Sequence, residues 1–113
     1  LSDWLESCAR LQREIPADVL VLPAHNEPFV GAHARLQELI DGHELCLKRV
    51  ERRLQSGPQR AVDLFGALFP GTVTSEVLGF ATGESLAHLN CLIARGRARR
   101  RPGPDGVALY EAV

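Results

Sequence analysis

The stretch VLVLPAHNEP, residues 19–28, decides the fold that we predict for this chain. Its first four residues are apolar and two of them are β-branched valines, which favours a short buried strand over residues 18–22. Pro16 and Pro23 bound this strand, because proline cannot donate to a central ladder. His25 follows on a turn, so the pattern presents one imidazole just beyond the end of a strand.

A single loop histidine does not by itself indicate a metal site. Catalytic zinc sites use three protein ligands and structural ones use four, whereas most loop histidines are plain polar residues. We expect His33 and His88 on the surface rather than at a metal. The role of His25 therefore has to be inferred from the other predicted helices and strands of the chain.

The composition is that of one globular domain, or of one small domain with part of another, with 113 residues, 45% hydrophobic and 24% charged. The net charge of −1 excludes a global basic field, so a nucleic-acid partner would need a local patch. No apolar run approaches the ~20 residues of a membrane span, and no signal peptide is recognisable. We therefore expect a cytoplasmic protein with no membrane partner. The cysteines are odd in number and widely spaced, which predicts free thiols at Cys8, Cys46 and Cys91.

Helical periodicity predicts an amphipathic helix over residues 2–14, before the strand, and a long helix over residues 32–55 after it. The first helix and the strand look like the last αβ unit of a layered α/β domain. The chain contains no methionine and begins inside a helix, so we expect it to be cut from a longer protein.

The C-terminal half predicts three short helices and a hairpin. Proline and glycine residues mark the ends of the predicted helices in this part, and Gly96 is a natural C-terminal cap for the last helix. The order of helices followed by a β-hairpin is that of a winged helix. The predicted elements are helices over residues 59–68, 75–80 and 84–95, then strands over residues 97–101 and 107–111 around an Asp-Gly turn.

With these elements in order, the chain resembles from end to end the C-terminal part of metallo-β-lactamase-fold hydrolases that carry a winged-helix domain, relatives of glyoxalase II and of the β-lactamase-like endoribonucleases. Residues 4–11 match the helix before the last strand, and residues 20–26 match the loop usually written Pro-Gly-His-Gly. Residues 43–53 match the linking helix, and residues 85–89 together with Gly96 match the last helix of the winged helix.

The resemblance implies that His25 is the last histidine ligand of a zinc site that holds two ions in the intact protein. Such a pair of metals generates a hydroxide near neutral pH and polarises the bond to be cleaved. Ala24 and Asn26 stand where the family usually has glycines, and a positive φ would strain Ala24 more than Asn26. The His-x-His-x-Asp-His cluster that supplies most ligands is absent from these 113 residues. We therefore expect this chain to be inactive alone.

The fold class that follows is mainly α with small β (α+β). Residues 1–31 would be the helix-strand remnant of an αββα catalytic domain, and residues 32–113 the linking helix with a three-helix winged-helix domain and its hairpin wing. The function implied is that of the C-terminal fragment of a zinc-dependent hydrolase for thioester, ester or phosphodiester substrates. Its partners would be the upstream catalytic domain, a small-molecule ester or thioester or an RNA substrate, and a second copy in a homodimer.

Two surfaces leave alternatives open. His43 lies on the apolar stripe of the long helix, where it is a core histidine or lines the approach of the substrate. A winged-helix nucleic-acid binder is the alternative function, with an arginine wing as its working surface, and the same arginines also suit a solvated edge hairpin. The helix that would enter a groove is expected to direct Glu84, His88, Cys91 and Arg95 outward. The candidate nucleic-acid ligands of the wing are Arg97, Arg99, Arg100 and Arg101.

Overall fold

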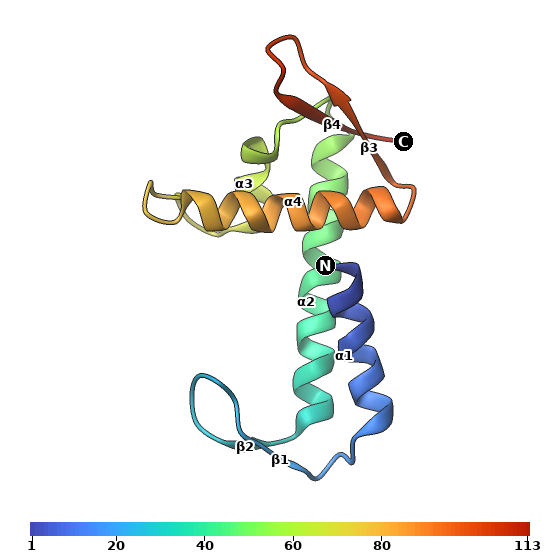
Figure 1. Ribbon diagram of the computed structural model, residues 1–113, viewed down its shortest axis with the longest axis vertical. Coiled ribbons are helices and arrows are strands. Elements are labelled where there is room, and N and C mark those ends of the chain that lie inside the picture. The colour runs from blue at the N-terminus through green and yellow to red at the C-terminus, as the bar shows by residue number, and fades with distance from the viewer. The chain divides into compact units, whose positions relative to one another are not determined.

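The structure, a computed structural model, describes residues 1–113 and is mainly helical with two small antiparallel hairpins (Figure 1). This confirms the predicted α+β class. No helix combines the length with the hydropathy that a bilayer-spanning segment needs. In chain order the elements are α1 (Ser2–Glu14), β1 (Leu20–Val21), β2 (Phe29–Val30), α2 (Ala32–Leu54), the 3₁₀ turn η1 (Ala61–Leu64), α3 (Phe65–Leu68), α4 (Leu78–Ala94), β3 (Ala98–Pro102) and β4 (Ala108–Ala112).

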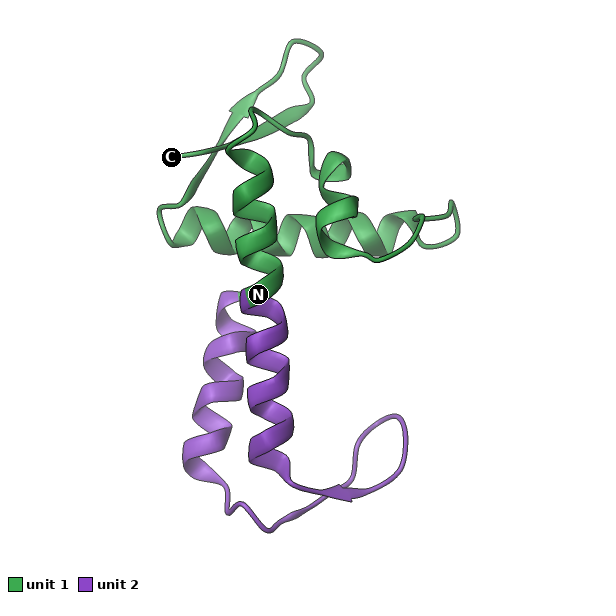
Figure 2. Cartoon of the chain, turned by 180° about the vertical axis from the view of Figure 1, so that it is seen from behind, with its two compact units in different colours: residues 1, 45–113 green, residues 2–44 purple.

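The chain divides into two compact units (Figure 2). One contains residues 2–44, and the other contains residue 1 together with residues 45–113. Helix α2 contributes residues to both units. The predicted domain division at residues 31 and 32 stays a prediction.

In the unit of residues 2–44, helix α1 packs beside the first turns of α2 through polar contacts at one end. Gln12 Nε2 donates to the carbonyl of His33 at 3.0 Å, and His33 Nε2 donates to the carbonyl of Ile15 at 2.8 Å. Leu5 and Cys8 are buried on α1. The predicted bounds of this helix are confirmed, and His33 is a half-buried structural residue that ties the end of α1 to α2.

The strand after α1 differs from its prediction. Only Leu20 and Val21 form β1, which pairs antiparallel with β2, and the strand is not buried: Leu20 is 64% and Leu22 is 75% exposed. Its partner β2 is also only two residues long, so the strand pairing covers fewer residues than the predicted strand of residues 18–22 and does not bury them. Pro23 reinforces the stop because it has no N–H to offer.

The unit of residues 45–113 has a continuous apolar core. The second half of α2, η1, α4 and the hairpin all contribute side chains to it. The backbones of Gln59 and Tyr110 exchange two hydrogen bonds of 2.8 Å, which joins the segment before η1 to β4. The buried apolar residues are Leu47, Val50, Leu54, Leu64, Ala81, Leu89, Cys91, Leu92, Ala98 and Tyr110.

The two helices predicted over residues 75–80 and 84–95 are one helix, α4. The predicted bounds place residues 81–83 between two helices. Gly83 does not interrupt α4, because glycine inside a helix costs only about 1 kcal/mol relative to alanine. Burial of Ala81, Ser85 and Leu89 along one side continues across Gly83 and outweighs that cost. The helix predicted over residues 59–68 is shorter and begins as the 3₁₀ turn η1 before α3.

The end of α4 and the hairpin follow the prediction closely. Gly96 has φ of 68°, and the N–H of Arg97 donates to the carbonyl of Leu92 at 2.9 Å, which is a Schellman cap. Strands β3 and β4 are each displaced by one residue from the predicted bounds. Gly106 has φ of 74° and completes the predicted turn.

Candidate functional site

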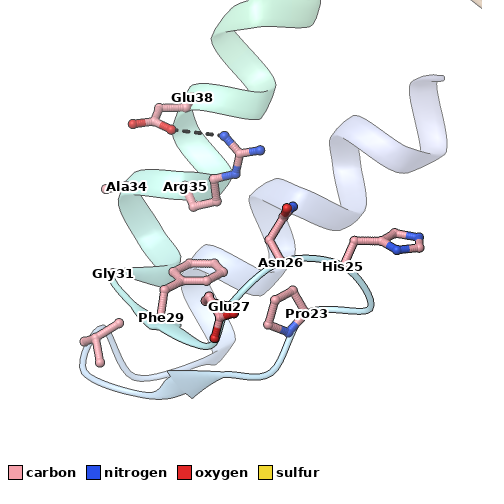
Figure 3. A pocket seen from close by; sticks show the side chains of 10 residues that line it. Pro23, His25, Asn26, Glu27, Phe29, Gly31, Ala34, Arg35 and Glu38 are labelled. Atoms are coloured by element: carbon pink, nitrogen blue, oxygen red, sulfur yellow. Dashed lines mark hydrogen bonds and ion pairs between the residues drawn. The ribbon is translucent and has the colours of Figure 1, made fainter.

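His25 lies on the loop between β1 and β2, at the edge of a cleft of about 490 Å³ (Figure 3). The walls come from this loop and from the first turns of α2. Arg35 and Glu38 of α2 form an exposed ion pair across the cleft wall, with Nη1 and Oε2 at 3.3 Å. The lining residues are Pro23, His25, Asn26, Glu27, Phe29, Val30, Gly31, Ala34, Arg35 and Glu38.

The loop obtains its sharp turn from Asn26 rather than from Ala24. Asn26 has φ of 69°, and it is the only non-glycine residue of the chain with a positive φ. Asparagine tolerates this left-handed region better than other residues with a Cβ atom. The loop therefore reaches its turn without glycine, and the positive φ falls on Asn26, the residue that was expected to tolerate it better than Ala24.

The imidazole of His25 is exposed, and its ring points away from Arg35 and Glu38 in Figure 3. No other histidine and no cysteine lines the cleft, and Glu27 is the carboxylate nearest to it in sequence. Zinc requires at least three protein ligands in a catalytic site. The loop therefore fits one ligand position of a metal centre and does not form a whole site, so the assignment of His25 as a metal ligand stays a prediction.

His43, the candidate for lining the substrate approach, is half-buried on α2. Its ring meets the ring of Trp4 edge to face, with centroids 4.8 Å apart and planes at 75°. Aromatic pairs of this geometry stabilise packing between neighbouring helices. Because Trp4 is itself 41% exposed, the contact is packing near the surface, and both the core role and the role in substrate approach stay predictions.

Helix α4 buries two of the four residues that were predicted to face outward, while Glu84 is half-buried and Arg95 is exposed. His88 is 1% exposed and Cys91 is 2% exposed, so the expected surface position of His88 is wrong. Nδ1 of His88 donates to the carbonyl of Glu84 at 2.9 Å, and Oε1 of Glu84 lies 3.5 Å from the same nitrogen. The helix is apolar on more than one side, which made a one-face reading of its sequence misleading. Buried in this way, His88 and Cys91 are not available to contact bases in a groove.

The arginines of the hairpin are largely engaged in ion pairs. Arg99 Nε donates to Glu111 Oε1 at 2.7 Å, and Arg101 Nε donates to Glu111 Oε2 at 3.2 Å. Arg97 pairs with Glu51 of α2. Hydrogen bonding from Arg99 is the largest cause that lowers the pKa of Glu111. The antiparallel register placed Arg99 opposite Glu111, a pairing that a search for basic runs alone does not reveal.

The three cysteines are free thiols, as predicted. Cys8 and Cys91 are buried and Cys46 is half-buried. Burial raises the pKa of the Cys8 thiol, which disfavours the thiolate needed for nucleophilic chemistry.

Comparisons with known proteins agree with the resemblance seen in the sequence. The family model described as "Metallo-beta-lactamase-like, C-terminal domain" matches residues 47–113. A beta-lactamase domain protein from Burkholderia ambifaria is similar with a TM-score of 0.90 and 34% identity, over 96% of this chain and 32% of the other. A metallo-beta-lactamase family protein from Thermus thermophilus is similar with a TM-score of 0.78 and 31% identity, over 100% of this chain and 33% of the other.

The chain thus spans about a third of the length of these two solved structures. A search of curated proteins finds no match. Because the family model covers more than half of the residues, the chain belongs to the metallo-beta-lactamase-like family and contains its C-terminal domain.

Proposed function

We propose that this chain is the C-terminal part of a zinc-dependent hydrolase with the metallo-β-lactamase fold, in which His25 supplies one metal ligand. The observation that carries the proposal is an exposed imidazole on a sharply turned loop directly after a strand, in a chain of this family. Imidazole held by a tight turn is a suitable ligand, because one ring nitrogen is free for the metal. The substrate would be a thioester, an ester or a phosphodiester.

The apolar side chains of the β1–β2 hairpin support a catalytic domain as partner. Leu20 and Val30 are each 64% exposed and Leu22 is 75% exposed. Three large aliphatic side chains exposed together are typical of a surface that another part of a protein covers. The likeness to metallo-β-lactamase proteins extends over 96% of the chain and so includes residues outside the C-terminal domain.

In this proposal, residues 32–113 form an accessory winged-helix domain that shapes the mouth of the active site or contributes to a homodimer. Helices α2, α3 and α4 followed by the β3–β4 hairpin supply the element order of such a domain. The chain alone is inactive, because a single imidazole does not hold a catalytic zinc. Three free thiols favour a cytoplasmic location.

Nucleic-acid binding by the arginine wing stays a prediction and is the less favoured function. Arg97 is paired with Glu51, while Arg99 and Arg101 share the single carboxylate of Glu111, so two acidic groups offset half of the charge of the four wing arginines. Arg100 lies on the opposite face of β3 from Arg99 and Arg101. The positive charge that remains on the wing gives less affinity for a phosphate backbone than four free arginines would give.

The test is His25→Ala in the complete protein, with the metal content per chain and the turnover measured on the same sample. We expect both to fall by at least about tenfold, since loss of even an outer-shell partner costs 10–100-fold in metal affinity or activity. Asn26→Gly is the matched control, because glycine keeps the positive φ of the turn and removes only the neighbouring side chain. Full metal content and turnover in His25→Ala would refute the proposal.

A further inference from the structure

A second cleft, of about 550 Å³, lies between the last turns of α2 and the segment of η1 and α3. It belongs entirely to the unit of residues 45–113 and is remote in sequence from the His25 loop. Three of its seven lining residues are arginines. The lining residues are Arg49, Arg52, Arg53, Ser56, Asp63, Gly66 and Ala67.

The three arginines share one side of α2. Arg49 precedes Arg52 by three residues and Arg53 by four, the spacings that bring side chains together on a helix. All three are exposed, and the structure pairs none of them with a carboxylate. Like charges at these spacings destabilise a helix, so the cluster needs a reason other than helix stability.

The helix dipole accounts for only part of this placement. Arg52 and Arg53 lie in the last turn of α2, where cations stabilise the partial negative charge of the helix end. Arg49 lies a turn earlier, where the effect of the dipole has fallen off. Arg49 therefore remains an exposed cation that no carboxylate and no helix end explains.

The one carboxylate in the cleft does not neutralise the arginines. Asp63 is held by Arg60 through both oxygens, with Nη2 to Oδ1 at 2.7 Å and Nε to Oδ2 at 3.0 Å. This fork-to-fork geometry satisfies the carboxylate from the side of η1. The hydrogen bond from Arg60 is the largest cause that lowers the pKa of Asp63, and the charge of Arg53 is the smallest. The charge of Arg60 cancels that of Asp63, so the cleft keeps the positive charge of its three α2 arginines.

The wall opposite the arginines leaves room for a ligand. Gly66 and Ala67 are small, and a Cβ atom built on Gly66 would meet no atom within 4 Å. Ser56 adds a hydroxyl that can donate to an anion. Guanidinium groups match phosphate oxygens in a bidentate geometry, which makes clustered arginines the usual receptor for phosphate.

We propose that this cleft binds the phosphate groups of an anionic ligand through Arg49, Arg52 and Arg53. The phosphates come from the phosphodiester backbone of a single-stranded RNA or from a free polyphosphate. The cleft differs in this respect from the β3–β4 hairpin, whose arginines Arg99 and Arg101 are held by Glu111. The proposal is independent of metal binding at His25 and can be tested without any hydrolase activity.

The experiment measures the affinity of the full chain for two probes, inorganic tripolyphosphate by calorimetry and a labelled 12-nucleotide single-stranded RNA by fluorescence anisotropy. The cleft variant is Arg49→Gln/Arg52→Gln/Arg53→Gln. The matched control is Arg99→Gln/Arg100→Gln/Arg101→Gln, which removes the same charge from the hairpin. A third variant, Gly66→Glu, keeps every arginine and places a carboxylate in the cleft, where the added Cβ has open space.

We expect the cleft variant and Gly66→Glu to lose at least about tenfold in affinity, and the hairpin control to keep its affinity within about twofold. If RNA is the ligand, three phosphate contacts give a salt slope of about −2, so affinity falls about twentyfold between 50 and 200 mM salt. Binding of tripolyphosphate alone assigns the site to free phosphates, and binding of RNA assigns it to a phosphodiester chain. Failure of both probes to bind at 50 mM salt, or an equal loss in the hairpin control, would overturn the proposal.

Discussion

The two units of this chain differ in how many apolar side chains they bury. The unit of residues 45–113 buries ten apolar residues from five elements, whereas among residues 2–44 only Leu5, Cys8 and Ala32 are buried. The unit of residues 2–44 also exposes Leu20, Leu22 and Val30. The second half of the chain thus carries its own core, while the first half leaves several large aliphatic side chains exposed.

The charges of the two units differ as well. Residues 45–113 contain ten Lys and Arg against six Asp and Glu, whereas residues 2–44 contain three against eight. The net charge of −1 therefore hides an acidic and a basic half. A summed charge says little about where a chain binds anions, and the arginine cleft shows why the local distribution has to be inspected.

The largest effect that tests this comparison is expected in the core of residues 45–113. Leu89 is fully buried on α4, so Leu89→Ala should lower the free energy of unfolding by about 2–5 kcal/mol. Leu22→Ala, at a 75% exposed position, should change it by less than about 0.5 kcal/mol. Urea unfolding followed by circular dichroism measures both. Similar losses in the two variants would contradict the contrast in burial.

A smaller effect is expected at two glycines, one in each unit. Gly96 has φ of 68°, so Gly96→Ala should destabilise the chain by about 1–2 kcal/mol. Gly42 lies inside α2 with open space around its Cα, so Gly42→Ala should stabilise by about 0.5–1 kcal/mol. The same urea titrations compare them. Equal signs for the two changes would show that backbone conformation does not separate these positions.

The smallest effect concerns pH. Hydrogen bonding from Arg60 lowers the pKa of Asp63, and hydrogen bonding from Arg99 lowers that of Glu111, both in the basic unit. A depressed folded-state pKa gives stability that is present above the unfolded pKa of about 4 and is lost as the pH falls through the folded value.

The free energy of unfolding should therefore fall as the pH drops from about 5 to about 3, and Arg60→Gln should make this fall shallower. Urea midpoints at pH 7 and at pH 3 measure the difference. Arg10→Gln, on α1 and outside these pairs, is the control and should keep the slope of the unchanged protein. If the free energy of unfolding falls as steeply with pH in Arg60→Gln as in the unchanged protein, the Arg60–Asp63 ion pair is not the cause of this fall.

Local sequence patterns predicted most of the helices and the hairpin, because helical periodicity, Gly96 and the Asp-Gly turn act over a few residues. The sequence patterns gave wrong predictions where burial of side chains in the tertiary structure determined the outcome. Gly83 did not interrupt α4, and His88 is inside rather than on the surface, since the packing of a helix on several sides cannot be read from a single stripe. The ion pairs of the wing arginines were not predicted from the sequence for a related reason, because partners such as Arg97 and Glu51 are far apart along the chain.

The sequence by itself determined the class of the fold, through short-range conformational preferences, and the family, through the resemblance of its ordered motifs. Only the tertiary structure decided which charges remain free. It paired the hairpin arginines with Glu51 and Glu111, and it left Arg49, Arg52 and Arg53 without an ion-pair partner in a cleft whose one carboxylate, Asp63, is bound by Arg60. The physical reason is that ion pairing depends on separations of a few ångströms in space, which sequence distance does not report.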